Sequence, residues 1–298
     1  MARPRGGWSN DCWNAWNRFD VISLDSDHLL RLRGIADRNR AEKSVTSLPG
    51  GMVTRARGNG LEPAELRAFA PGDDPRHLDR NATARTGHPH VRMFHAERDR
   101  TTLLIADFRP SMLWGTRRTL RSVAAAEALA VAGWSAVLSG GRVGLIAVTA
   151  ADEVLVPPRA RDRAMVRVIG ALATAHRSAL AEPAAAEPPL TDALSMANRI
   201  APRGSEVVLA SAMDHAGEAF REQMQGLASR TDVRIIRISD AFEMDPPSGR
   251  YRFATRDRPE GREGRPMAAD QTDRTAVGIN IPVEVWHSAR APEAQHHG

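Results

Sequence analysis

The sequence is poor in cysteine and has no long apolar run. Cys12 is the only cysteine among 298 residues, which excludes an intrachain disulfide framework and a zinc site built from cysteines. No run of about eighteen apolar residues occurs, so we expect no membrane-spanning segment. The opening stretch MARPRGGWSNDCWNAWNRF contains neither a continuous apolar core nor a small-residue cleavage site, so we expect no secretory signal. These absences predict a cytoplasmic protein.

Lysine is almost absent as well. Lys43 is the only lysine, so nearly all of the 41 basic residues are arginines, and the net charge is +5. The arginines alternate with acids, as in HAERDR, instead of forming a basic block. Because a planar guanidinium pairs well with a carboxylate, we expect many of them in ion pairs. A basic nucleic-acid-binding protein is an alternative function, although we do not expect nucleic acid as a partner.

Common catalytic and nucleotide-binding motifs are missing too. The chain has no G-x-S-x-G, no H-E-x-x-H, no Walker A loop and no dinucleotide-binding glycine motif. Cys12 lies among Trp8, Trp13 and Trp16 without a basic cluster to activate its thiol, so we interpret it as unreactive. The tryptophans either dock a partner or pack the amino-terminal segment onto the body of the protein.

What the sequence does contain, from residue 101 onward, is an alternation of buried strands and helices. The run TTLLIADF at 101–108 predicts a buried strand, and the alanine-rich stretch 119–141, which ends in two glycines, predicts a helix. Two strands around a turn follow at 142–159, and then a helix at about 161–176. After them we expect a helix at 191–201, a strand at 206–213, a helix at 217–229 and a strand at 233–239. A last short strand follows MDPPSG. This order predicts an α/β fold with a doubly wound, mostly parallel sheet.

The pattern divides the chain into four regions. We expect a partly helical amino-terminal segment at 1–46, a glycine-punctuated segment packing on the sheet at 47–100, the α/β domain at 101–258, and a charged, loosely ordered tail at 259–298. One apolar island in the tail, GINIPVEVW at 278–286, is an alternative edge strand of the sheet.

The segment before the first strand carries an ordered set of motifs. The stretches GNGLEPAELRAFAPGDDPRHLDRNATAR and VRMFHAERDRTTLLIADFRPSM resemble the domain of unknown function 58 family, and the resemblance extends from about Leu48 to Phe253. It implies a von Willebrand factor A-like domain preceded by a signature segment with structural or partner-binding roles. The signature residues in this chain are Glu65, Arg67, Gly72, Asp73, Asp74, Arg76, Asp79, Arg85, Glu97 and Arg98.

The family resemblance also implies a role. Members of the family are commonly encoded beside MoxR-type AAA+ ATPases and are taken to help assemble or activate other complexes. The resemblance therefore implies a non-enzymatic adaptor or co-chaperone whose partners are a MoxR-type AAA+ ATPase and an unknown client complex. The missing phosphate-binding loop agrees with this role, because the ATP chemistry would then belong to the partner.

The resemblance further implies where a metal ion would bind. A von Willebrand factor A domain often holds Mg²⁺ beyond the carboxyl ends of its strands, through D-x-S-x-S, a threonine and a later aspartate. Oxygen ligands of this kind suit Mg²⁺. In this chain the first motif is D-F-R-P-S, in which Asp107 and Ser111 match but Arg109 replaces a serine. A guanidinium has no lone pair to offer a cation.

The remaining metal ligands are also incomplete. Thr191 is the candidate threonine, although it equally suits a helix N-cap. Ala212 stands where an aspartate is expected, and Asp214 follows two residues later. We therefore expect a degenerate metal-ion-dependent adhesion site that binds no Mg²⁺ and no other cofactor. Arg109 either takes the electrostatic place of the metal, pairing with Asp107 and Asp214, or lies exposed in a loop.

The acids of APGDDPRHLDRNATAR (70–85) allow a second chemical interpretation. With His77, the acids Asp73, Asp74 and Asp79 could form a metal-dependent hydrolase centre. However, P-G followed by D-D-P is typical of turns in which aspartates accept backbone N–H groups. Arginines at 67, 76, 80 and 85 lie close enough in sequence to pair with these acids. We expect a rigid, ion-paired connection, and we expect no catalytic residue in the chain.

Overall fold

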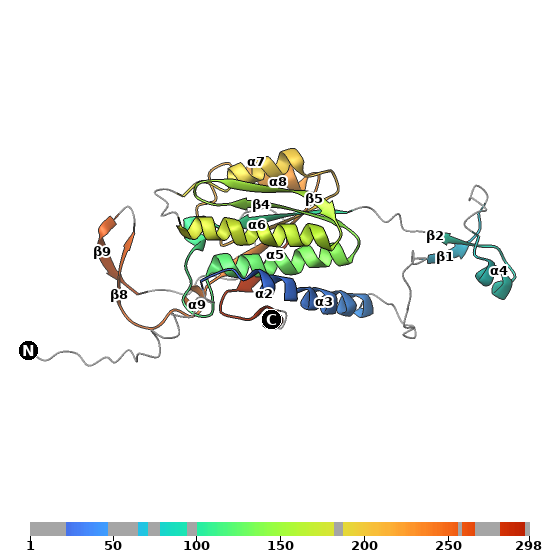
Figure 1. The fold of residues 1–298 in the computed structure, drawn as a ribbon, viewed down its shortest axis with the longest axis horizontal. Coiled ribbons are helices and arrows are strands. Elements are labelled where there is room, and N and C mark those ends of the chain that lie inside the picture. The colour runs from blue at the N-terminus through green and yellow to red at the C-terminus, as the bar shows by residue number, and fades with distance from the viewer. Residues whose placement is uncertain are drawn as a thin grey trace, which may run out of the picture.

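The computed structural model describes residues 22–46, 65–70, 78–93, 100–181, 187–255, 258–265 and 281–295. A six-stranded sheet lies at its centre, with the strand order β10-β7-β6-β3-β4-β5 (Figure 1). The strands are β3 (Thr101–Asp107), β4 (Arg142–Val148), β5 (Glu153–Ala160), β6 (Glu206–Ser211), β7 (Asp232–Ser239) and β10 (Val283–His287). All neighbours are parallel except β4 and β5. The prediction of a mostly parallel α/β sheet is confirmed.

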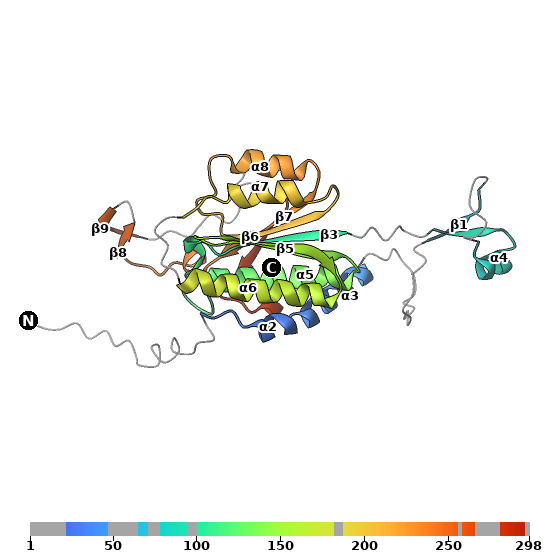
Figure 2. The same cartoon turned by 45° about the horizontal axis from the view of Figure 1, so that its top comes forward.

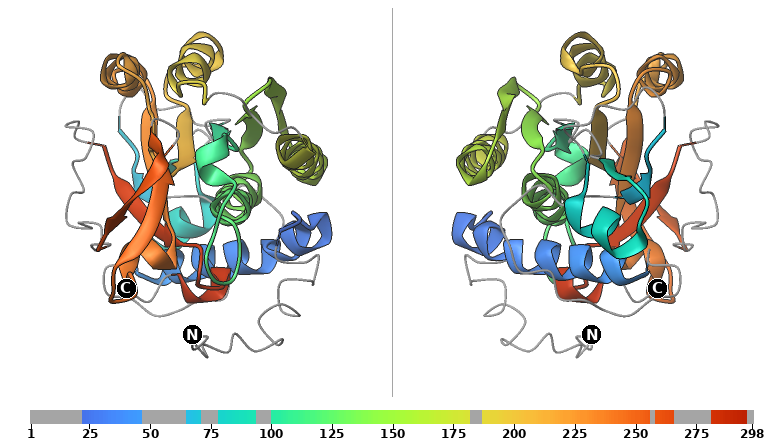
Figure 3. Two further views of the ribbon diagram at one scale, coloured as in Figure 1. Left: turned by 90° about the vertical axis from the view of Figure 1, so that its left-hand side faces the viewer. Right: turned by 90° about the vertical axis from the view of Figure 1, so that its right-hand side faces the viewer.

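Helices cover both faces of this sheet, as Figures 2 and 3 show. Every residue of β3 is buried, and successive side chains point to opposite faces. Leu104 and Ala106 pack in the core with α5 (Arg121–Leu138) and α6 (Asp162–Ala181). Leu103 and Ile105 pack in the core with α7 (Thr191–Ile200) and α8 (Phe220–Ala228).

A third layer covers the outer side of α5. The helices α2 (Ser26–Arg31) and α3 (Arg33–Thr46) bury Leu29, Leu32 and Ile35 in the same core as α5. The indole Nε1 of Trp134 donates to the backbone carbonyl of Leu29 at 3.1 Å. In the described part of the chain, α5 is the one helix long and apolar enough to span a membrane, but 83% of it is buried inside the fold. Its composition is therefore that of a core helix enclosed on all sides.

The carboxyl-terminal strand corrects one expectation. β10 pairs in parallel with β7 at the edge of the sheet, and Trp286 is buried. The expectation of a loosely ordered tail is therefore wrong for residues 281–295, and the alternative of an edge strand holds for Val283–His287. The sequence did not predict this strand with certainty, because its short apolar run stands among charged residues. Its pairing partner β7 lies far earlier in the chain and leaves no local pattern.

Two further two-stranded sheets do not join the central sheet. β1 (Glu65–Ala68) and β2 (His90–Met93) form an antiparallel pair with α4 (Arg80–Thr86) between them. The short strand predicted after MDPPSG is β8 (Tyr251–Thr255), which pairs with β9 (Arg258–Gly264) and does not join the central sheet. Single-turn elements are η2 (Pro110–Met112), α9 (Ala241–Met244) and η3 (Pro292–Ala294).

Candidate functional site

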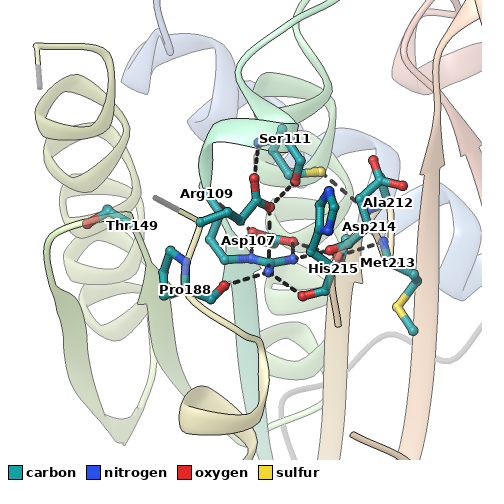
Figure 4. Close-up of polar contacts among 12 residues, drawn as sticks. Asp107, Arg109, Ser111, Thr149, Pro188, Ala212, Met213, Asp214 and His215 are labelled. Carbon is teal, nitrogen blue, oxygen red and sulfur yellow. Dashed lines mark hydrogen bonds and ion pairs between the residues drawn. The ribbon is translucent and has the colours of Figure 1, made fainter. Parts of the chain in front are cut away.

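The polar cluster of most interest lies where β3 and β6 end. These strands are neighbours in the sheet and run in parallel, so the loops that follow them meet at the same edge. Figure 4 shows Asp107, the last residue of β3, and Arg109 of the following loop facing Asp214 and His215 of the loop after β6. We call this group the carboxyl-edge site, which comprises Asp107, Arg109, Ser111, Glu187, Pro188, Ser211, Asp214 and His215.

Arg109 and Asp107 form a bidentate ion pair inside the protein. The guanidinium Nε donates to Oδ1 of Asp107 at 2.9 Å, and Nη2 donates to Oδ2 at 2.9 Å. Both side chains are 0% exposed. Fork-to-fork geometry of this kind is among the strongest charge-assisted arrangements available to protein side chains. The alternative that Arg109 lies exposed in a loop is therefore wrong.

The other donors of Arg109 bind backbone carbonyls from two further loops. Nη1 donates to Pro188 at 2.8 Å and to His215 at 3.0 Å, and Nη2 donates to Asp214 at 2.8 Å. A guanidinium has five N–H donors, so every one of them is used. Arg109 thus ties together the segments after β3, before α7 and after β6.

Asp107 is equally saturated on its own side. Oδ1 accepts from the backbone N–H and the Nε of Arg109 at 3.1 and 2.9 Å. Oδ2 accepts from Nη2 of Arg109 and from the hydroxyl of Ser211 at 2.6 Å. A carboxylate offers about four lone-pair positions, and all four are occupied. Neither partner of the pair keeps a free group for a ligand.

The loop after β6 is bent to present its carbonyls to Arg109. Met213 and His215 have φ values of 69° and 49°, in the left-handed region that side-chain-bearing residues rarely adopt. Ser211 steadies the start of this bend by accepting the backbone N–H of Met213 at 2.9 Å. Strained backbone of this kind persists when surrounding contacts fix it, and here the guanidinium of Arg109 binds the carbonyls of Asp214 and His215.

Ser111 is engaged within the same network. Its backbone N–H donates to Oε2 of Glu187 at 2.9 Å, and its hydroxyl donates to Oε1 of the same carboxylate. Oε1 of Glu187 also lies 3.5 Å from Nη1 of Arg109. The hydroxyl that matches the metal motif therefore binds a protein carboxylate.

A second buried cation lies beside the first. Arg121 is 2% exposed and donates through Nη1 to Oδ2 of Asp214 at 2.8 Å and through Nη2 to Glu243. Its guanidinium also lies 4.4 Å from the ring centroid of Trp114, a cation–π distance. Arg121 begins α5, where a positive charge opposes the helix dipole. The two carboxylates offset this unfavourable placement.

Asp214 connects the two arginines. Its backbone carbonyl binds Arg109 and its carboxylate binds Arg121. The expected pairing of Arg109 with Asp214 is thus made through the backbone, and the side chain serves the other cation. The side chains of Asp214, Glu243 and Glu187 remain 44%, 27% and 16% exposed. We call these three carboxylates the acidic rim.

A further carboxylate, Asp240, anchors the neighbouring loops. Asp240, after β7, accepts from the backbone N–H of Thr116 at 3.0 Å, from its hydroxyl, and from the hydroxyl of Ser288 at 2.9 Å. Burial alone would raise the pKa of Asp240, but these hydrogen bonds and one from the backbone of Phe242 outweigh it and lower the pKa. Asp240 therefore stays ionised and joins β7, the loop after β3 and the end of β10.

The remaining metal-site candidates are used elsewhere. Thr191 is the first residue of α7, whose N-cap is Leu190 without a side-chain cap, so the N-cap interpretation of Thr191 is wrong. Ala212 donates its backbone N–H to the sulfur of Met112 at 3.2 Å. Thr149, which the sequence did not single out, follows β4; it lies apart in Figure 4 and binds within its own turn, to Asp152. Among the described residues, no three His, Cys, Asp or Glu side chains are grouped so that they could hold a metal ion.

The signature segment is described only in part. Asp79 is buried and caps α4 by accepting the backbone N–H of Ala82 at 2.8 Å, as expected for an aspartate in turn chemistry. Arg85 lies in the last turn of α4, and Glu65 and Arg67 lie on β1. The other signature residues, Gly72, Asp73, Asp74, Arg76, Glu97 and Arg98, lie outside the described residues, as do Cys12 and the nearby tryptophans.

Two titratable groups are buried in the core away from this edge. His176 of α6 is 1% exposed, its Nε2 lies 2.9 Å from the hydroxyl of Ser122, and burial lowers its pKa to about 4. Glu127 of α5 binds Arg118 at 2.9 Å and 2.5 Å and His28 at 2.9 Å. Burial alone would raise the pKa of Glu127, yet these hydrogen bonds lower it, and the bond to Glu127 raises the pKa of His28.

Comparison with known proteins settles the family. Residues 65–267 match the family described as "Protein of unknown function DUF58". The chain belongs to this family. It is 32% identical over 197 residues to the uncharacterized proteins Rv1480 of Mycobacterium tuberculosis (strain ATCC 25618 / H37Rv) and Mb1516 of Mycobacterium bovis. The match covers 64% of this chain and 58% of those proteins, so the chain spans a little over half the length of these relatives.

Two solved structures show a distant likeness to this member of the DUF58 family. BatB, a conserved hypothetical protein from Bacteroides thetaiotaomicron, has a TM-score of 0.43 and 12% identity, covering 66% of this chain and 93% of its own. An aerotolerance-related membrane protein from Bacteroides fragilis has a TM-score of 0.42 and 16% identity, covering 64% and 93%. At such scores no functional conclusion transfers to this chain.

Proposed function

We propose that this DUF58 protein is a non-enzymatic binding module of the von Willebrand factor A type, acting in the cytoplasm as an adaptor for a MoxR-type AAA+ ATPase. The observation that carries the proposal is the saturation of the Asp107–Arg109 pair. All five donors of Arg109 and all four acceptor positions of Asp107 are bound within the protein. A site closed in this way supplies no open coordination position and no free nucleophile, so its role is to hold loops in one arrangement.

The loops held by Arg109 and Arg121 carry the surface offered to a partner. The acidic rim surrounds the two buried guanidinium groups, and Phe242 beside it is 38% exposed. An exposed aromatic side chain next to the acidic rim is complementary to a partner surface that carries basic and apolar groups. Preorganised loops lower the entropic cost of such an association.

A metal-dependent hydrolase centred on Asp73–Asp79 is the alternative, and one observation weighs against it. Asp79 is buried and accepts the backbone N–H of Ala82, which is the role of a helix cap and not of a metal ligand. Loss of a metal-dependent hydrolase activity in an Asp74→Ala variant would favour this alternative over the adaptor.

The adaptor is tested by capture from native lysate, with and without ATP and with and without a chelator of divalent ions. We expect a MoxR-type AAA+ ATPase, identified by mass spectrometry, to be retained in the presence of chelator, because the site uses arginine and not a metal ion. The variant Asp214→Asn with Glu243→Gln removes rim charge but keeps oxygens for Arg121, and should retain less ATPase. The matched control is Glu218→Gln with Glu222→Gln, two exposed acids near α8. Recovery of no AAA+ protein under any condition would refute the adaptor role.

A further inference from the structure

The outer side of α6 carries arginines without acids to pair with. Five exposed arginines lie on the end of β5 and along α6, namely Arg159, Arg161, Arg163, Arg167 and Arg177. We call them, with Val166, the arginine face. Within the described ranges none of the five makes an ion pair, whereas Arg33, Arg118 and Arg234 each do. Surfaces usually intersperse both signs of charge, so five exposed arginines in one short segment concentrate positive charge there.

The charge of this segment is not offset locally. Residues 159–177 contain five arginines and one aspartate, a net charge of +4 with the buried His176 neutral. The one aspartate, Asp162, is held by Arg33 of α3, which brings a further positive charge. No carboxylate within the segment is therefore left to neutralise the arginine face.

Helical geometry places these side chains on one surface. Exposed residues of α6 follow helical spacing, at positions 163, 166, 167, 170, 174 and 177. Met165, Val168 and Ile169 are buried in the core. At a rise of about 1.5 Å per residue, Arg163 and Arg177 lie roughly 21 Å apart along the helix axis. Figure 3 shows α6 at the rim of the molecule, with no other described element outside it.

The arginine face also exposes apolar side chains. Val166 is 50% exposed, and Leu180 at the end of α6 is 40% exposed. Gly170 lies in the middle of the helix, and a Cβ added there would meet no atom within 4 Å. Arginine mixed with apolar groups is typical of protein–protein interfaces, whereas binding to phosphate backbones needs the cations alone.

We propose that the arginine face docks an acidic, amphipathic helix of a partner protein. Carboxylates of such a helix can engage Arg163, Arg167 and Arg177 in bidentate pairs, while its apolar stripe covers Val166. Because the guanidinium groups are exposed, the pairs speed and orient association and weaken as salt rises. This docking surface is separate from the acidic rim and shares no side chain with it, so it stands whether or not the adaptor role does.

The test measures binding of a fluorescein-labelled helical peptide of glutamate and leucine with one apolar stripe, by fluorescence anisotropy on the full chain. We expect the stripe peptide to bind more tightly than a scrambled peptide of the same composition. Arg163→Glu with Arg167→Glu should weaken binding by about tenfold or more, and Val166→Ser should weaken it as well. The matched control is Arg203→Glu with Arg221→Glu, two exposed arginines at the α7–α8 layer, with the fold of each variant checked by circular dichroism.

Three results would overturn the proposal. Equal weakening by the control pair would mean that overall charge alone attracts the peptide. Equal affinity for the scrambled peptide would show that the protein does not recognise an amphipathic helix. The third result has two parts: the stripe peptide fails to bind, and the wild-type protein binds duplex DNA or phosphatidylglycerol vesicles. If the Arg163→Glu/Arg167→Glu variant loses that binding, the arginine face belongs to a different class of ligand.

Discussion

Arg109 and Asp107, two residues apart at the end of β3, saturate each other inside the protein. The bidentate pair measures 2.9 Å at both contacts, and both side chains are fully buried. The remaining donors of Arg109 bind carbonyls of Pro188, Asp214 and His215. A fixed cation from the chain itself thus joins three loops at the edge where open α/β sheets usually bind ligands.

Removal of this cation should strongly destabilise the fold. In Arg109→Met, the buried carboxylate of Asp107 keeps the hydrogen bond from the hydroxyl of Ser211 but loses its positive partner. The backbone carbonyls that accept from Arg109 lose their donor as well. We expect the free energy of unfolding to fall by roughly 3–5 kcal/mol, the usual cost of leaving a buried charge unpaired. Urea denaturation followed by circular dichroism measures this loss. The exposed Arg203→Met is the control and should change stability by less than about 0.5 kcal/mol.

A second substitution tests whether the pair acts as a unit. Adding Asp107→Asn to Arg109→Met removes the uncompensated charge, so the double variant should be less destabilised than the sum of the two single variants. Contacting residues typically couple by about 0.5–3 kcal/mol. Strict additivity of the two effects would show that the two charges do not depend on each other.

The buried His176 should make stability fall in mild acid. Its pKa is lowered to about 4 in the folded protein, below the ordinary 6.5, so the unfolded chain binds a proton first as the pH falls. One such group costs roughly 2 kcal/mol between pH 7 and pH 5. Urea denaturation at both pH values should show this loss, and His176→Gln should lack most of it. An unchanged pH dependence in that variant would contradict the assignment.

His28 should have the opposite pH dependence. Its pKa is raised, chiefly by the hydrogen bond to Glu127, so its contribution to stability is present below its ordinary pKa of 6.5 and is lost as the pH rises through the raised value. His28→Gln should therefore lower stability more at pH 6 than at pH 9. The same substitution at the exposed His88 is the control. Equal losses at both pH values would show that the Glu127 contact does not depend on the charge of His28.

The docking of β10 is tested by its buried tryptophan. Trp286 is 2% exposed in the same core as α5, so Trp286→Ala should lower the free energy of unfolding by about 3–5 kcal/mol. Tyr251→Ala, at an exposed position of β8, should have little effect. If Trp286→Ala leaves stability unchanged, residues 281–295 do not form part of the cooperative fold.

The sheet could be predicted from sequence because its signals are local. Runs such as 101–108 and 206–213 are rich in apolar residues and alternate with helices of ordinary length, and a parallel sheet follows from that order. β10 could not be predicted with the same ease, since its partner β7 lies far away in the chain. Its short apolar run among charged residues is equally compatible with a tail.

The site was predictable in outline and not in detail. The family resemblance makes D-F-R-P-S an indication that Arg109 stands where a metal ligand is expected, and its pairing with Asp107 follows from charge and spacing. Glu187, Ser211 and Arg121 gave no such signal, because the loops that carry them meet only in the folded sheet. Arg121 in particular begins a helix, where dipole arguments favour acids, so its role depends on the distant Asp214 and Glu243.

Titration calorimetry with Mg²⁺ tests most directly whether Arg109 takes the place of a metal ion. Wild-type protein should give no binding heat up to about 10 mM, a concentration well above that at which dedicated sites fill. Arg109→Ser restores a hydroxyl beside Asp107 and Ser111 and frees three carbonyls, so this variant should bind Mg²⁺ measurably. Tight Mg²⁺ binding by the wild-type chain would contradict the replacement of the metal by Arg109.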